Sequence, residues 1–221
     1  MSTKRLRDRV RSLLQDGDLE AVAELATSRK QVLGSLIALT FDPDLQVVWR
    51  AIEAMGLVVA ELESSEKAYL KEHMRRLYWL ITEESGAVFW RAPECMAECS
   101  YRAPRLFESH IPIAFHLLET LEEEDLEHFR PGALWAIGRL HTLARDHLPA
   151  LLPLVEEALD RKDPQSRGLA VWCLGEVGEV GGLESRPALM DDRGVVHLYR
   201  DRNVMETTVG AIAREVLAAA R

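Results

Sequence analysis

Small and large apolar residues recur along the chain in one short pattern, small-x-x-small-large-small. The first of five copies reads Ala51-x-x-Ala54-Met55-Gly56, and the copies end at Gly56, Ala97, Gly138, Gly175 and Ala213. These end points lie 41, 41, 37 and 38 residues apart. A fixed period in this range is typical of helical hairpins that stack on one another, so the pattern predicts an α-solenoid.

Apolar residues at helical spacing predict an outer and an inner helix in each repeat, and the inner helix carries the small-residue pattern. Small side chains on one helical face let the paired helix pack closely. Pro93 and Pro131 belong in first turns, where proline is tolerated. We expect helices over 3–14, 18–27, 31–40, 45–62, 65–81, a segment through 96, 112–121, a segment opening at 131, 147–159 and 165–177, and a last one from about 207.

The rhythm of the repeats breaks at residues 178–187, and the next segment is rich in β-branched and aromatic residues. Val195 to Arg200 therefore predicts a strand, Asp201-Arg202-Asn203 a turn, and Val204 to Glu206 a return strand. Asn203 is the residue that tolerates a positive φ. Because a two-stranded hairpin is marginal alone, we expect it to dock on the final helices.

These elements predict an all-α fold with one short β-hairpin near residues 195–206. We expect a single solenoid domain over residues 1–221. Within it, residues 1–28 form N-terminal cap helices, 29–180 form the core repeats, and 181–221 form the hairpin and a C-terminal cap helix.

Composition narrows the possible partners. A net charge of -9 and a pI near 5.3 disfavour nucleic acid, because binding to a phosphate backbone needs a basic surface. No apolar run approaches the roughly 20 residues of a membrane span, and the charged N-terminus differs from a secretory signal. The three cysteines are typical of a reducing compartment. We therefore expect a cytoplasmic protein that binds no membrane; its oligomeric state stays open.

The chain contains no nucleophile elbow, phosphate-binding loop, zincin helix or dinucleotide fingerprint. Glu94 and Glu98 lie one helical turn apart, and a solvated helix face is favoured over catalysis for them. A zinc set is conceivable from Cys95, Cys99, His110 and His116, but Cys95 occupies a small-residue position of the repeat and a core role is favoured. We predict no catalytic residue, metal ligand or cofactor, and we favour a protein that is not an enzyme.

A ridge runs along the inner helices at positions seven and three before each repeat end and one after it. Four of the five tryptophans fall on this ridge, and tryptophan and arginine dominate binding hot spots. The predicted partner-binding residues are Trp49, Arg50, Trp90, Arg91, Glu94, Trp135, Arg139, Trp172 and Glu176. In the alternative interpretation, the tryptophans fill gaps between adjacent inner helices.

The first helix is strongly basic. It carries Lys4, Arg5, Arg7, Arg9 and Arg11 against one aspartate. These residues suit an anionic surface or an acidic partner; the alternative is a solvated cap over the end of the solenoid, which repeat arrays need. We favour the cap.

Two segments resemble a known repeat. Asp42-Pro43-Asp44-x-x-Val47-x-x-x-Ala51-x-x-Ala54-x-Gly56 resembles a HEAT repeat of the short bacterial type that also occurs in phycobilisome bilin lyases, and Asp163-Pro164-Gln165 with Ala170-x-x-Cys173-Leu174-Gly175 is similar to a second copy. The blocks 89–94 and 129–132 resemble those of a bacterial HEAT-like group without a known activity. The resemblance implies a right-handed α-α superhelix and a protein that binds other proteins.

The leading functional hypothesis is a non-enzymatic scaffold that binds a protein or peptide through the concave ridge of inner helices, with an exposed aromatic patch. Two alternatives are open. One is an enzyme of the HEAT-like DNA glycosylase type, whose groove should be basic. The other is a bilin- or cofactor-handling protein, suggested by the lyase-like repeats alone.

Overall fold

A computed structural model describes residues 2–82, 91–121 and 126–220 of the chain. These residues form two compact units. Unit 1 comprises Met1–Glu108 and Tyr199–Val204, and unit 2 comprises Ser109–Leu198 and Met205–Arg221. The single domain expected over residues 1–221 stays a prediction.

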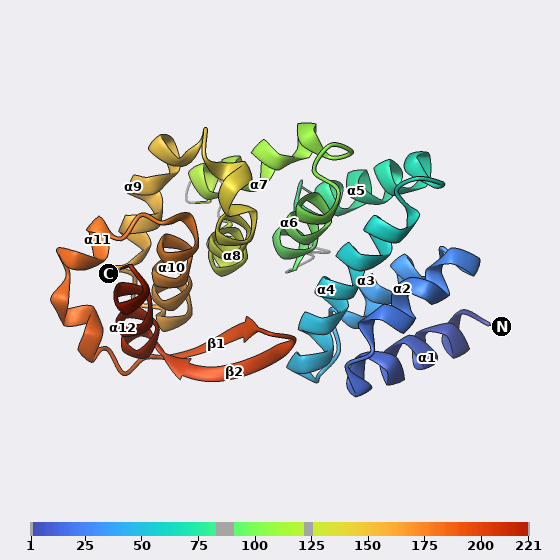
Figure 1. Ribbon diagram of the computed structural model, residues 1–221, viewed down its shortest axis with the longest axis horizontal. Coiled ribbons are helices and arrows are strands. Elements are labelled where there is room, and N and C mark those ends of the chain that lie inside the picture. Colours follow the sequence, from blue (N-terminus) through green and yellow to red (C-terminus); the bar gives the residue numbers. More distant parts are fainter. Residues whose placement is uncertain (1, 83–90, 122–125, 221) are drawn as a thin grey trace. The chain divides into compact units, whose positions relative to one another are not determined.

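Unit 1 contains three helical pairs. The inner helices α2, α4 and α6 pack in sequence, α4 against both neighbours, while α1 packs against α3 and α5 against α6 (Figure 1). Asp18 and Asp44 accept a main-chain N–H at the starts of α2 and α4. The helices are α1 (Thr3–Asp16), α2 (Leu19–Ser28), α3 (Val32–Leu39), α4 (Leu45–Leu62), α5 (Lys67–Thr82) and α6 (Ala92–Arg102).

The basic helix α1 is amphipathic. Its apolar stripe is buried and contains Leu6, Val10, Leu13 and Leu14. Arg11 forms two hydrogen bonds with the largely buried carboxylate of Asp42, at 2.7 and 3.1 Å. That pairing, chiefly through the hydrogen bond, lowers the pKa of Asp42 below its usual value. The helix therefore covers one end of unit 1, as a cap does.

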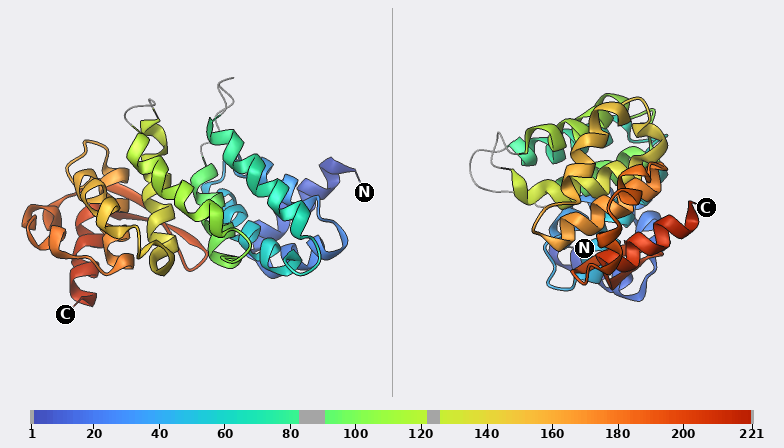
Figure 2. Two further views of the ribbon diagram at one scale, coloured as in Figure 1. Left: turned by 90° about the horizontal axis from the view of Figure 1, so that it is seen from above. Right: turned by 90° about the vertical axis from the view of Figure 1, so that its left-hand side faces the viewer.

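Unit 2 also has two layers of helices. The inner helices α8, α10 and α12 pack in sequence, and α7 and α9 form a second layer beside α8 and α10 (Figures 1 and 2). Pro131 lies in the first turn of α8, as expected, and Pro93 does so in α6. The elements from residue 108 on are η1 (Glu108–His110), α7 (Ile111–Thr120), η2 (Glu127–Phe129), α8 (Arg130–Leu140), η3 (His141–Ala144), α9 (Leu148–Ala158), α10 (Pro164–Val177), α11 (Gly181–Glu184), η4 (Pro187–Asp191) and α12 (Val209–Ala219).

The predicted hairpin is confirmed as a two-stranded sheet of β1 (Val195–Arg200) and β2 (Asn203–Thr208). The positive φ angles fall on Asp201 (50°) and Arg202 (63°), so the expectation that Asn203 would carry one is wrong. Two consecutive residues of this kind are typical of the tight turns that match the twist of a hairpin.

The hairpin docks on the final helices with its base alone. Val196 lies over Gly168 of α10, where an added Cβ would be 2.4 Å from a Val196 methyl carbon. The tip, Tyr199–Val204, groups with unit 1. The expectation that the hairpin rests on the final helices is therefore correct for the base and wrong for the tip.

Glycines of the repeat pattern mark where successive inner helices approach most closely. A Cβ added to Gly56 of α4 would lie 2.7 Å from Glu98 of α6, and one on Gly175 of α10 would lie 2.7 Å from Val216 of α12. The small-residue seam thus lies between inner helices of consecutive repeats. This corrects the expectation that it joins the two helices of one pair.

Replacing Gly138 of α8 with alanine should destabilise unit 2. The new Cβ would lie 2.6 Å from Cζ3 of Trp172, whose rigid ring fills the seam. We expect the free energy of unfolding to fall by about 1–3 kcal/mol, measured by urea denaturation. Gly34→Ala is the control, because a Cβ there meets nothing within 4 Å and helix propensity should raise stability by about 0.5–1 kcal/mol. Equal changes in the free energy of unfolding for the two variants would contradict close packing at Gly138.

Candidate binding surface on the inner helices

The described ridge tryptophans are buried. Trp49 is 3% exposed, Trp135 4% and Trp172 7%. In unit 2, Trp135 and Trp172 stack with ring centroids 6.2 Å apart and planes 14° apart. The predicted exposed aromatic patch is therefore wrong for these three residues, because each fills space between neighbouring elements. Trp90 lies outside the described residues.

The other predicted ridge residues differ in exposure. Glu94 is buried, Arg50, Arg91 and Arg139 are half-buried, and Glu176 is exposed. Trp79 of α5, which the ridge does not include, is 64% exposed. Apart from buried Glu94, the charged residues of this set are partly or fully exposed to solvent, while its described tryptophans belong to the core.

Trp49 lies in a small polar and aromatic cluster of unit 1. Its ring stacks on Tyr199 at a centroid distance of 5.4 Å, and the guanidinium carbon of Arg91 lies 5.3 Å from its centre. Arg91 also donates to Glu94 at 2.8 Å. Burial raises the pKa of Glu94 above its usual value, although the charge of Arg91 opposes this. Glu94 Oε2 is buried and has no hydrogen-bond partner among the described residues.

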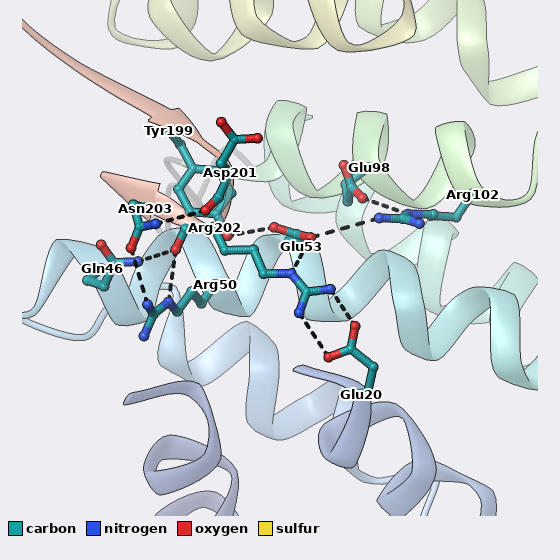
Figure 3. Close-up of polar contacts among 10 residues, drawn as sticks. All are labelled: Glu20, Gln46, Arg50, Glu53, Glu98, Arg102, Tyr199, Asp201, Arg202 and Asn203. Carbon is teal, nitrogen blue, oxygen red and sulfur yellow. Dashed lines mark hydrogen bonds and ion pairs between the residues drawn. The ribbon is translucent and has the colours of Figure 1, made fainter. Parts of the chain in front are cut away.

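The hairpin tip inserts an arginine between two acidic residues of unit 1. The guanidinium of Arg202 donates to Glu20 through two nitrogens, one of them at 2.9 Å, and its Nε lies 3.4 Å from Glu53 Oε1 (Figure 3). The hydroxyl of Tyr199 donates to the other oxygen of Glu53 at 2.6 Å. The tip thus presents a cation and a phenol to carboxylates of α2 and α4.

The main chain of the tip is held as well. The side-chain amide of Gln46 donates to the carbonyl of Arg202 at 2.6 Å and accepts from the N–H of Val204 at 2.9 Å. Arg50 Nε donates to the same carbonyl at 3.0 Å, while its Nη1 donates to the carbonyls of Leu14 and Gln15 at the end of α1. Of the predicted residues, Arg50 is the one that directly contacts this segment's main chain.

Unit 2 uses the same device. Gln165 donates to the carbonyl of His197 at 2.9 Å and accepts from its N–H at 2.9 Å. Gln46 and Gln165 both lie ten residues before a repeat glycine, Gly56 and Gly175, and each follows an aspartate N-cap. Equivalent positions of two repeats therefore bind main chain through both ends of a side-chain amide. Gln46 bonds two residues, Arg202 of the turn and Val204 of β2, whereas Gln165 bonds a single residue of β1.

A further arginine extends the polar network within unit 1. Arg102 donates to Glu98 at 3.1 Å and lies 3.9 Å from Glu53 (Figure 3). Glu98 is 1% exposed, so the solvated face expected for Glu94 and Glu98 is wrong: both are buried beside arginines. Burial, followed by the hydrogen bond to Glu53, raises the pKa of Tyr199, so this phenol stays protonated and donating.

The cysteines behave as core residues. Cys95 and Cys99 are buried, and desolvation raises the pKa of both thiols, which are protonated at neutral pH. In the part of the chain that the structure describes, no group of three or more His, Cys, Asp or Glu residues is placed to hold a metal ion. No described helix is both long and apolar enough to cross a bilayer.

Comparisons with known proteins place this architecture among α-solenoids. A designed armadillo repeat protein superposes with a TM-score of 0.52 at 16% identity, over 100% of this chain and 95% of that chain. An engineered protein superposes with a TM-score of 0.51 at 15% identity, over 96% of each chain. At such identities the likeness concerns the fold alone. The chain is an α-solenoid.

Sequence comparisons indicate the type of repeat. Residues 127–177 match the model of the HEAT-like repeat family. An uncharacterized protein of Archaeoglobus fulgidus is 26% identical over 183 residues, which are 82% of this chain and 93% of that protein. The HEAT-like resemblance is confirmed. Its finer assignment to the bilin-lyase type or to a bacterial group stays a prediction.

Glu20, Tyr199 and Arg202 were not predicted as binding residues, and Glu53 fell on the predicted ridge without being named among them. These four residues meet through contacts between distant segments, which no local pattern reports. Gln46 and Gln165 could have been found from the sequence, because both repeats have an aspartate N-cap and a glutamine at the same distance from the repeat glycine.

Replacing Glu94 with glutamine should make stability less dependent on pH. The folded pKa of Glu94 is raised, so its stabilising contribution is complete below the unfolded pKa and is lost as pH rises through the folded value. Relative to wild type, Glu94→Gln should therefore gain stability from pH 4 to pH 8, measured by urea denaturation at each pH. Glu61→Gln, at an exposed position of α4, is the control. If the stability of Glu94→Gln relative to wild type instead fell with rising pH, the pKa of Glu94 would be lowered in the folded state and not raised.

Proposed function

We propose that the chain is a protein-interaction scaffold whose inner-helix face in unit 1 binds an arginine-bearing segment of a protein partner. The observation that carries this proposal is the bidentate hold of Gln46 on the main chain of the hairpin tip, 156 and 158 residues further along the sequence. Main-chain hydrogen bonds are a general means of binding extended peptides, because every sequence offers them.

Recurrence of the device supports a role beyond one local contact. Gln165 also donates to and accepts from main chain in unit 2, at the single residue His197, from the equivalent position of its repeat. Each inner helix of this kind can therefore hold one stretch of chain, and the neighbouring side chains decide which stretch fits. In peptide-binding surfaces generally, hydrogen bonds to the main chain supply affinity and contacts with side chains supply specificity.

Charge supplies the selection in unit 1. Glu20 and Glu53 accept the guanidinium of Arg202, and Arg50 with Gln46 holds its carbonyl. A partner segment with an arginine at this place satisfies the same groups. The chain's own tip competes for the surface, and because it is tethered, its effective concentration is high. The partner must displace it.

The alternative functions receive no support from the geometry. Glu94 and Glu98, the carboxylates near Trp49, are each 1% exposed and beside arginines, so an extruded DNA base has no access to them. The tryptophans that would line a groove for a base are buried wherever they are described.

A shortened hairpin tests the proposal. Replacing Tyr199–Val204 by Asn-Gly removes the tip, while Leu198 and Met205 flank a two-residue turn with the register of the original pairing. We expect this variant, screened against displayed random peptides, to enrich sequences that contain arginine. The wild-type chain should enrich them at least about tenfold less, because its tip occupies the surface.

Two matched variants serve as controls for this screen. Adding Glu20→Gln and Glu53→Gln to the shortened chain should abolish the enrichment of arginine, whereas adding Glu61→Gln and Glu63→Gln at the far end of α4 should not. Circular dichroism establishes that each chain is folded. Enrichment without arginine, or none at all by a folded shortened chain, would overturn the proposed function.

A further inference from the structure

A second surface of unit 1 lies away from the inner-helix face. Helices α1, α3 and α5 enclose a cavity of about 450 Å³ that opens to solvent. Cavities of 300–1,000 Å³ are the usual size of small-molecule sites. Its lining is rich in cations, two of which, Lys4 and Arg7, belong to the basic first helix that the sequence analysis favoured as a cap.

The charges of this cavity are unbalanced. Lys4 and Arg7 of α1 and Arg76 of α5 line it, and none of the three forms an ion pair with another residue in the described part of the chain. Glu72, the acidic residue of the lining, is paired with Arg75. All three side chains are exposed to solvent, and their positive charges, gathered at one cavity in a chain of net charge -9, favour an anion there.

Polar groups on the cavity wall also lack partners. Ser35 of α3 is 4% exposed, and its buried hydroxyl has no hydrogen-bond partner among the described residues. A buried polar group without a partner is costly, by about 1–3 kcal/mol. Ser35 belongs to the cavity lining, and a ligand that reaches this hydroxyl and accepts from it removes that cost.

His73 of α5 completes this part of the wall. It is 5% exposed, and its Nε2 lies 3.4 Å from the sulfur of Met55. Burial, followed by the charge of Arg76, lowers the pKa of His73 to about 4. At neutral pH the imidazole is therefore uncharged, and the positive charge of the cavity comes from the two arginines and the lysine.

We infer that this cavity binds a small organic phosphate. Two guanidinium groups and an ammonium are the usual partners of a phosphate group, because arginine binds its oxygens in bidentate fashion. A bare inorganic ion would leave most of 450 Å³ empty, whereas an organic substituent fills the space beside Gly34, Ala38 and Tyr69. The inference is independent of the proposed peptide-binding surface.

Isothermal titration calorimetry with adenosine monophosphate, glucose 6-phosphate and glycerol 3-phosphate tests it at low ionic strength. At least one ester should bind saturably and more tightly than inorganic phosphate. Arg76→Gln should weaken binding about tenfold or more. Arg5→Gln removes one charge from α1 outside the cavity lining and is the matched control, with an expected change below about twofold.

A steric variant guards against loss of folding as the explanation. Gly34 lines the cavity within α3, and a Cβ there meets nothing within 4 Å, so the position has room for a side chain and Gly34→Leu adds bulk at the cavity. It should keep the thermal stability of the wild-type chain and lose ester binding.

Three results would overturn the inference. One is that no phosphate monoester binds saturably, and another is that Arg5→Gln weakens binding as much as Arg76→Gln, which would indicate a diffuse field. The third concerns the source of the phosphate: if a phosphoserine peptide binds and none of the free esters does, the cavity receives a modified protein and not a small molecule.

Discussion

The close approach of successive inner helices is the constraint on which the rest of the structure depends. At Gly56, Gly138 and Gly175 the next inner helix lies so near that a single methyl group would collide with it. Side chains that face these glycines, such as Glu98 and Trp172, are consequently covered from both sides. Positions that would be exposed on an isolated helix become part of the core, because close packing leaves no space between repeats.

Because the inner helices pack so closely, polar side chains and not the tryptophans make the contacts with other segments. Glu94 and Glu98 are buried, and buried carboxylates need compensating partners, which Arg91 and Arg102 supply. Side chains near the starts of the inner helices lie outside the tightest packing and can contact other segments. Gln46, Gln165 and Arg50 bind main chain there, whereas Trp135 and Trp172 stack on each other.

Features that depend on residues close together in the sequence could be predicted, and features that depend on distant residues could not. The bounds of α4 and the existence of the hairpin are encoded in local periodicity and residue type, and both were predicted. The resting place of the tip was not, because it depends on Arg202 meeting Glu20 and Glu53 far away in the chain. The ridge of tryptophans was a correct observation of register, but register alone does not distinguish a groove from a seam; the distance between helices decides that.

The hairpin tip is held strongly by some contacts and weakly by others. The pair of Arg202 and Glu20 is exposed, and such pairs contribute little to stability, whereas the stack of Tyr199 on Trp49 and the hydrogen bond to Glu53 are more sheltered from solvent. In the proposed function, the more exposed ion pair selects a cation, and the main-chain bonds hold the segment that carries it. A partner with its own arginine would replace the tip group by group, since the glutamine and the carboxylates do not distinguish an internal ligand from an external one.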